Sequence, residues 1–184
     1  MGRSQDIRVL VTGPCATATA SLIQSVAQGP IVVTDVLHDV PDAVPVDLGA
    51  RATPVMGVGV YAPNDGPRLF LFGTPGAERG WVITSALRRE VDAVAFVVDA
   101  DAAHTHSEAG VALRSLQIGL TVPLVVAVNR CDDPNDARTI ATSLGARSDA
   151  TVVACQLIDP RSGRDVVIEM LAAALEAGPD RRVA

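Results

Sequence analysis

The sequence predicts an α/β fold: a single three-layer domain with a mostly parallel six-stranded sheet and helices on both faces. Two observations carry this prediction. Short apolar runs alternate with segments of helical periodicity, which is typical of strand–helix–strand units. The 184 residues are 48% hydrophobic but only 3% aromatic, so the core must be built from Val, Ala and Leu. Such a composition suits a buried parallel sheet with small side chains at the helix contacts.

The N-terminal half is predicted to contain three strands and two helices. Apolar runs bounded by turn residues predict strands at Ile7 to Thr12, Val55 to Tyr61 and Leu69 to Phe72, and helical patterns cover Ala18 to Ala27 and Gly80 to Arg89. The turn-forming stretch APNDGPR joins the second and third strands, so we expect a hairpin there. The segment from Gly29 to Thr53 has no clear period, and it forms a long irregular connection or carries a short extra strand at Ile31 to Val33.

The C-terminal half continues the alternation with three strands and three helices. The strands are expected at Ala93 to Val98, Leu124 to Val128 and Thr151 to Ala154, and the helices at Glu108 to Gln117, Asp136 to Leu144 and Asp165 to Ala177. Because a helix follows each of these strands, the strands should be parallel. The length suits one domain over residues 1–184, with a frayed tail from about residue 178.

Charge and composition exclude several classes of function. The net charge is −6 and no basic block is present, which argues against nucleic acid or an anionic membrane as the main partner. No stretch approaches the roughly 18 apolar residues of a membrane span. The three cysteines are scattered and the start lacks the apolar region of a signal peptide, so we expect a reduced, cytoplasmic protein. All 15 basic residues are Arg, so a catalytic or phosphate-binding lysine is excluded.

The segment from Gly13 to Ala20 follows the first strand, where a phosphate-binding P-loop would lie. A P-loop has the pattern G-x-x-x-x-G-K-[ST]: its backbone N–H groups surround the phosphates, its Lys neutralises them, and its hydroxyl binds Mg²⁺. Here the segment is GPCATATA, and only its first glycine fits the pattern. Taken alone, this segment predicts an ordinary turn from a strand into a helix.

Two further stretches follow strands in the order expected of a nucleotide-binding protein. The third strand leads into the stretch FLFGTPGAERGW. The buried fifth strand leads into VVAVNRCDD, which has Asn129 and Asp132 at the end of that strand. Ligands of open α/β sheets bind at the carboxyl ends of the strands. In GTP-binding proteins an Asn and an Asp with this spacing hydrogen-bond the guanine edge, so we expect a ligand site at this edge of the sheet.

These stretches resemble the small Ras-like GTPases, and most closely the conservon-type GTP-binding proteins of actinobacteria. The family has an LFGTPGQ-R-W segment, to which LFLFGTPGAERGW is similar. Its guanine-specificity strand resembles VPLVVAVNRCDD, and its switch threonine falls at Thr53. The resemblance covers about Ile7 to Leu175. It implies the small-GTPase fold and a role in signalling, since such proteins are encoded beside a sensor kinase and a roadblock-domain protein.

The chain departs from this family at the positions that handle phosphate and metal. Thr19 stands in place of the P-loop Lys, Ala18 in place of its second Gly, and Ala20 in place of the Mg²⁺-binding hydroxyl. Gly73 replaces the Asp of the usual D-x-x-G, as in the conservon group, and Ala77 replaces the Gln that orients the attacking water. In this family a further segment closes the base pocket, and the corresponding stretch here, VACQLIDPRSG, is a poor match to it. Base recognition is therefore only half supported.

The resemblance and the departures together predict a degenerate small GTPase-like signalling protein that acts by binding another protein and lacks GTP hydrolysis. We expect no catalytic residue, no metal ligand and no required cofactor, with GTP or GDP bound weakly at most. If nucleotide binding is retained, the expected contacts are Gly13, Thr17, Thr19, Ser21, Thr53, Gly76, Asn129 and Asp132. Glu78, Arg79 and Trp81 are the expected partner-binding residues, and the suspected partner is a roadblock-domain-type regulatory protein.

Two alternative functions remain open. The chain could be a functional GTP switch in which an arginine, with Arg51 as the candidate, replaces the P-loop Lys. It could also be an unrelated α/β small-molecule-binding protein in which the match at Asn129 to Asp132 is accidental. Separately, the side chains of DADAAHTHSE could bind a divalent metal, although a solvated loop accounts for them better.

Overall fold

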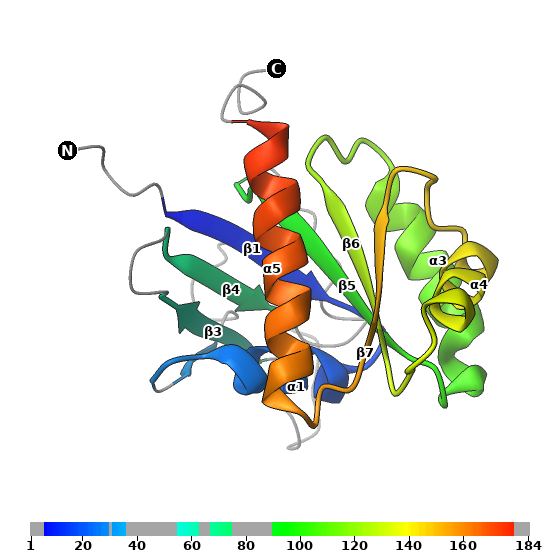
Figure 1. The fold of residues 1–184 in the computed structure, drawn as a ribbon, viewed down its shortest axis with the longest axis horizontal. Coiled ribbons are helices and arrows are strands. Elements are labelled where there is room, and N and C mark those ends of the chain that lie inside the picture. Colours follow the sequence, from blue (N-terminus) through cyan, green and yellow to red (C-terminus); the bar gives the residue numbers. More distant parts are fainter. Residues whose placement is uncertain (1–5, 30, 36–54, 63–66, 75–89, 179–184) are drawn as a thin grey trace, which may run out of the picture.

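The computed structural model describes residues 6–29, 31–35, 55–62, 67–74 and 90–178. In this part of the chain seven strands form one sheet in the order β2-β3-β4-β1-β5-β6-β7 (Figure 1). The strands are β1 (Ile7–Thr12), β2 (Val32–Asp35), β3 (Val55–Tyr61), β4 (Leu69–Gly73), β5 (Ala93–Asp99), β6 (Leu124–Asn129) and β7 (Thr151–Cys155). The six strands expected from the sequence are all present, and β2 lies where the extra strand was expected.

The sheet is mostly parallel, as predicted. β4, β1, β5, β6 and β7 run parallel to one another, while β3 is antiparallel to both β2 and β4. The predicted hairpin is confirmed, because Tyr61 at the end of β3 pairs with Leu69 at the start of β4. The five parallel strands therefore end at one edge of the sheet, the edge at which we expected a ligand site.

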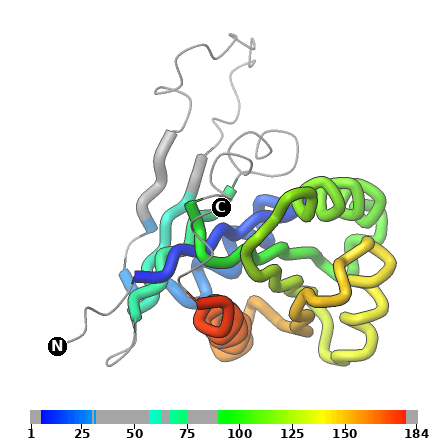
Figure 2. Tube along the Cα trace, turned by 90° about the horizontal axis from the view of Figure 1, so that it is seen from above, coloured from blue at the N-terminus to red at the C-terminus, as the bar shows by residue number. Residues whose placement is uncertain are grey.

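Four α-helices in the described residues cover the two faces of this sheet. They are α1 (Ala16–Val26), α3 (His106–Gln117), α4 (Pro134–Leu144) and α5 (Pro160–Ala177). α1 and α5 pack on one face, and α3 and α4 pack on the other. Figure 2 shows this three-layer arrangement from above, with α5 and α3 on opposite sides of the strands. The predicted helix over Gly80 to Arg89 lies outside the described residues.

Each observed helix begins earlier than the sequence analysis predicted. α4 and α5 follow an Asp-Pro pair, and the carboxylates of Asp133 and Asp159 accept hydrogen bonds from the N–H groups of Asn135 at 2.7 Å and Arg161 at 2.9 Å. Asp is a favoured N-cap, and Pro suits the first helical position because its missing N–H has no partner there. The predicted starts at Asp136 and Asp165 were wrong because the caps were not recognised.

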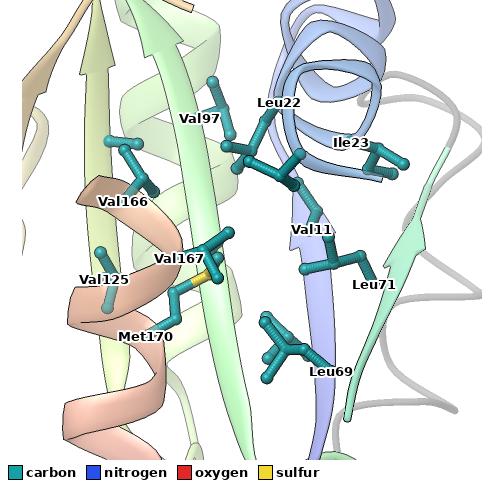
Figure 3. Close-up of a cluster of buried hydrophobic side chains, with 14 of the residues drawn as sticks. Val11, Leu22, Ile23, Leu69, Leu71, Val97, Val125, Val166, Val167 and Met170 are labelled. Atoms are coloured by element: carbon teal, nitrogen blue, oxygen red, sulfur yellow. The ribbon is translucent and has the colours of Figure 1, made fainter. Parts of the chain in front are cut away.

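The core is aliphatic, as the composition predicted. Figure 3 shows the layer between the sheet and the α1–α5 face, where side chains from β1, β4, β5, α1 and α5 meet. Its members include Val11, Leu22, Ile23, Leu69, Leu71, Val97, Val166, Val167 and Met170. None of the described helices is long and apolar enough to cross a membrane.

Candidate functional site

The turn between β1 and α1 is short and closely packed. β1 ends at Thr12 and α1 begins at Ala16, so three residues join them. A Cβ atom on Gly13 would overlap the carbonyl oxygen of Val97 in β5. Only glycine fits so close to another backbone, and Gly13 is therefore required by packing whether or not a phosphate binds here.

Two of the three α1 hydroxyl groups predicted to contact phosphate donate to backbone carbonyls one turn earlier. Thr19, which the sequence analysis aligned with the P-loop Lys, is only 2% exposed, and its hydroxyl donates to the carbonyl of Cys15 at 3.3 Å. The Ser21 hydroxyl donates to the carbonyl of Thr17 at 2.8 Å, while Thr17 itself is exposed at the start of α1. Thr19 thus lies in the packed interior, and Thr17 is the member of this group most open to solvent.

Gly73, at the position of the usual Asp of D-x-x-G, is covered by apolar atoms of α1. A Cβ atom on Gly73 would lie 2.5 Å from Cδ1 of Ile23 and 3.5 Å from Cγ2 of Thr19. A side chain at position 73 would thus meet an isoleucine methyl group. Figure 3 shows Ile23 on α1 in the same apolar layer as Leu71 of β4.

The ends of β1 and β4 are joined by a buried threonine pair that the sequence analysis missed. The hydroxyl of Thr74 donates to that of Thr12 at 2.9 Å, and the Thr74 N–H donates to the carbonyl of Val11 at 3.0 Å. Both threonines end strands that are neighbours in the sheet. In the sequence, a polar residue at the carboxyl end of each of these two strands was the signal that could have predicted this pair.

Asn129 lies at the end of β6, and its side chain bridges two other segments. Its amide Nδ2 donates to Oδ1 of Asp99 at the end of β5, and its Oδ1 accepts from the backbone N–H of Leu157 at 2.8 Å. Asn129 is 8% exposed, so both hydrogen bonds are shielded from water. The side chain therefore ties β5 and β6 to the segment between β7 and α5.

Asp132 is exposed and is held by the same β7–α5 segment. The side-chain amide Nε2 of Gln156 donates to Oδ1 of Asp132 at 3.0 Å, and the backbone N–H of Gln156 donates to the Ser162 hydroxyl at 2.8 Å. The donor on Asp132 is therefore an amide N–H group of the protein itself. The structure thus brings Asn129 and Asp132 together at one edge, with a protein donor on Asp132.

The histidine- and aspartate-containing segment after β5 does not assemble a metal site. Residues Ala103–Thr105 form a 3₁₀ turn and His106 begins α3, where its Nε2 lies 3.0 Å from the carbonyl oxygen of Asp99. Asp101 lies 3.9 Å from the guanidinium of Arg130 on the surface. Across the described residues, no group of three or more His, Cys, Asp or Glu side chains could hold a metal ion. The segment forms a turn and the start of α3, where a solvated loop was expected.

The three cysteines are free thiols in different environments. For Cys15, burial favours a higher pKa, but the N–H of Ala18 and the hydroxyl and N–H of Thr17 favour the thiolate, and the net effect lowers the pKa. Cys15 is the residue before α1, so these groups belong to the start of that helix. Burial raises the pKa of the Cys131 thiol, and burial raises that of Cys155 to about 12.

Several predicted residues lie outside the described part of the chain. They are Thr53 and Gly76 of the expected nucleotide contacts, the partner-binding residues Glu78, Arg79 and Trp81, and the alternative cation Arg51. Their roles stay predictions.

The fold is shared with small GTPases of known structure. The chain is similar to the Arl6 (BBS3) small GTPase of Trypanosoma brucei with the bound nucleotide analogue GppNp, with a TM-score of 0.64 and 14% identity over 95% of this chain and 100% of that one. It is also similar to the cytosolic domain of the T. maritima FeoB iron transporter in its GDP form, with a TM-score of 0.59 and 15% identity over 94% of this chain and 65% of that one. Neither a protein-family model nor a curated protein sequence matches the chain. The small-GTPase fold expected from the resemblance is confirmed.

Proposed function

We propose that this chain is a degenerate small GTPase-like signalling protein that acts by binding another protein and does not hydrolyse GTP. One observation carries the proposal: Thr19 and Ile23 of α1 pack over Gly73, where a hydrolytic site would hold a lysine and a carboxylate. The fold of a GTPase is kept, but the centre of its phosphate and metal site is apolar.

The balance of charge supports weak nucleotide binding at most. A bound triphosphate needs cations or many N–H donors to offset several negative charges, and the chain contains no lysine. Of the predicted contact hydroxyls, those of Thr19 and Ser21 already bind backbone carbonyls. Charge-assisted hydrogen bonds contribute about 1.5–3 kcal/mol each, so loss of the Lys and the Mg²⁺ ligand weakens binding by roughly 10² to 10⁴.

The base side of the site also favours the nucleotide-free form. A guanine base must displace Gln156 before it can reach the carboxylate of Asp132, whereas Asn129 uses its oxygen and its amide within the protein. Asp132 therefore has an internal donor in place of a base.

The partner in this proposal is a roadblock-domain-type regulatory protein in the cytoplasm, bound through the surface from Thr53 to Trp81. This part of the proposal is supported by the resemblance to conservon-type proteins and by the aromatic Trp81 among charged residues. We expect Trp81→Ala to weaken that complex in titration calorimetry and to leave the fold intact. Unchanged affinity would contradict the assignment of this surface.

The decisive experiment identifies what the purified protein carries. The native protein is denatured, and any released small molecule is separated by chromatography and identified by mass spectrometry. We expect no stoichiometric nucleotide. GDP or GTP released in equal amount to the protein would support the active switch, and loss of that nucleotide in Arg51→Ala would identify the arginine as its cation. Release of a different small molecule would support the unrelated α/β binding protein.

A further inference from the structure

We draw no further inference here: the strongest candidate, the exposed apolar side chain of Ile158 on the turn between β7 and α5, carries nothing because nothing in the structure shows what covers it.

Discussion

The side-chain oxygen of Asn129 accepts a hydrogen bond from the backbone N–H of Leu157 at 2.8 Å, and this contact holds the β7–α5 segment against β6. Asn129 also donates to Asp99, while the exposed Asp132 accepts a hydrogen bond from the side chain of Gln156 at 3.0 Å. The two residues of the expected base-recognition pair therefore differ in structural role. Asn129 is a buried bridge, and Asp132 is a surface acceptor.

This difference predicts unequal effects on stability. Asn129→Ala leaves the N–H of Leu157 and the carboxylate of Asp99 without their partner, so we expect it to lower the free energy of unfolding by about 2–4 kcal/mol. Asp132→Ala removes an exposed contact and should change that free energy by less than about 0.5 kcal/mol. Urea unfolding followed by circular dichroism measures both variants. Equal losses would show that Asn129 does not have the bridging role.

The sequence predicted the sheet well because each strand has a local signal. The apolar runs at Ile7 to Thr12 and Val55 to Tyr61 match β1 and β3, and the turn-forming stretch after Tyr61 indicates the antiparallel pairing with β4. The predicted starts of the helices were less accurate, because a helix start is set by the single hydrogen bond of its cap and not by the apolar periodicity of the helix. The carboxylate of Asp133 and the following Pro134 set the start of α4 before its apolar periodicity begins.

The candidate site could be predicted only to the level of the sheet edge. Parallel strands end together, so the sequence was enough to expect Asn129 and Asp132 at one edge. The contact of Gln156 with Asp132 and the packing of Ile23 over Gly73 join segments far apart in the chain. Such contacts depend on how side chains fill the folded interior, and no local pattern encodes them.

The packing of Ile23 over Gly73 predicts a specific rescue. Gly73→Ala should destabilise the protein by about 1–2 kcal/mol, because its Cβ lies 2.5 Å from Cδ1 of Ile23. Ile23→Val removes that methyl and alone costs about 1 kcal/mol, so the double variant should lose less than the sum of the two. Thermal and urea unfolding of the four proteins measure this coupling.

Gly59 supplies the control for this cycle. A Cβ on Gly59 would lie 2.5 Å from Cγ2 of Ile23, a methyl group that valine keeps. We therefore expect the losses from Gly59→Ala and Ile23→Val to add. Rescue of Gly59→Ala by Ile23→Val, or strict additivity for Gly73→Ala, would contradict the packing of Ile23.

Restoring a lysine at position 19 should damage the fold. Thr19 is 2% exposed, so Thr19→Lys places an ammonium group in the interior without a partner. We expect a loss of at least about 3 kcal/mol, which is a fall in Tm of roughly 6–12 °C for a chain of this size. Ala20→Lys puts the same side chain on the exposed side of α1 and should change the Tm little. Equal stability of the two variants would show that position 19 can open toward solvent.

Cys15 should be the most reactive of the three thiols. Its pKa is lowered from the ordinary value of 9.0 by N–H groups and a hydroxyl at the start of α1, and it is partly exposed. Burial raises the pKa of Cys155 to about 12, so that thiol stays protonated at neutral pH. We expect iodoacetamide at about pH 7.5 to modify Cys15 first, with a rate that rises with pH and reaches half of its maximum below pH 9.0.

Peptide mapping by mass spectrometry at several pH values measures this order. Cys15→Ser serves as the control, because its loss should remove the fast phase of modification and leave the slow modification of the buried thiols. Faster labelling of Cys131 or Cys155 in the native protein would contradict the assignment.

The last prediction concerns catalysis: the purified protein should not hydrolyse GTP above the uncatalysed rate. Phosphoryl transfer depends on positioning and on electrostatic stabilisation of the transferred group. In this chain Thr19, which the resemblance aligns with the P-loop Lys, is buried, and Ile23 packs over Gly73, which the resemblance aligns with the Asp of D-x-x-G. Phosphate release measured with and without Mg²⁺ should therefore match a buffer control. Turnover that collapses in Arg51→Ala but persists in Arg138→Ala, a change on the exposed side of α4, would show that an arginine has replaced the lysine. The chain would then be an active switch, because neither a contaminating enzyme nor a general loss of positive charge would distinguish these two arginines.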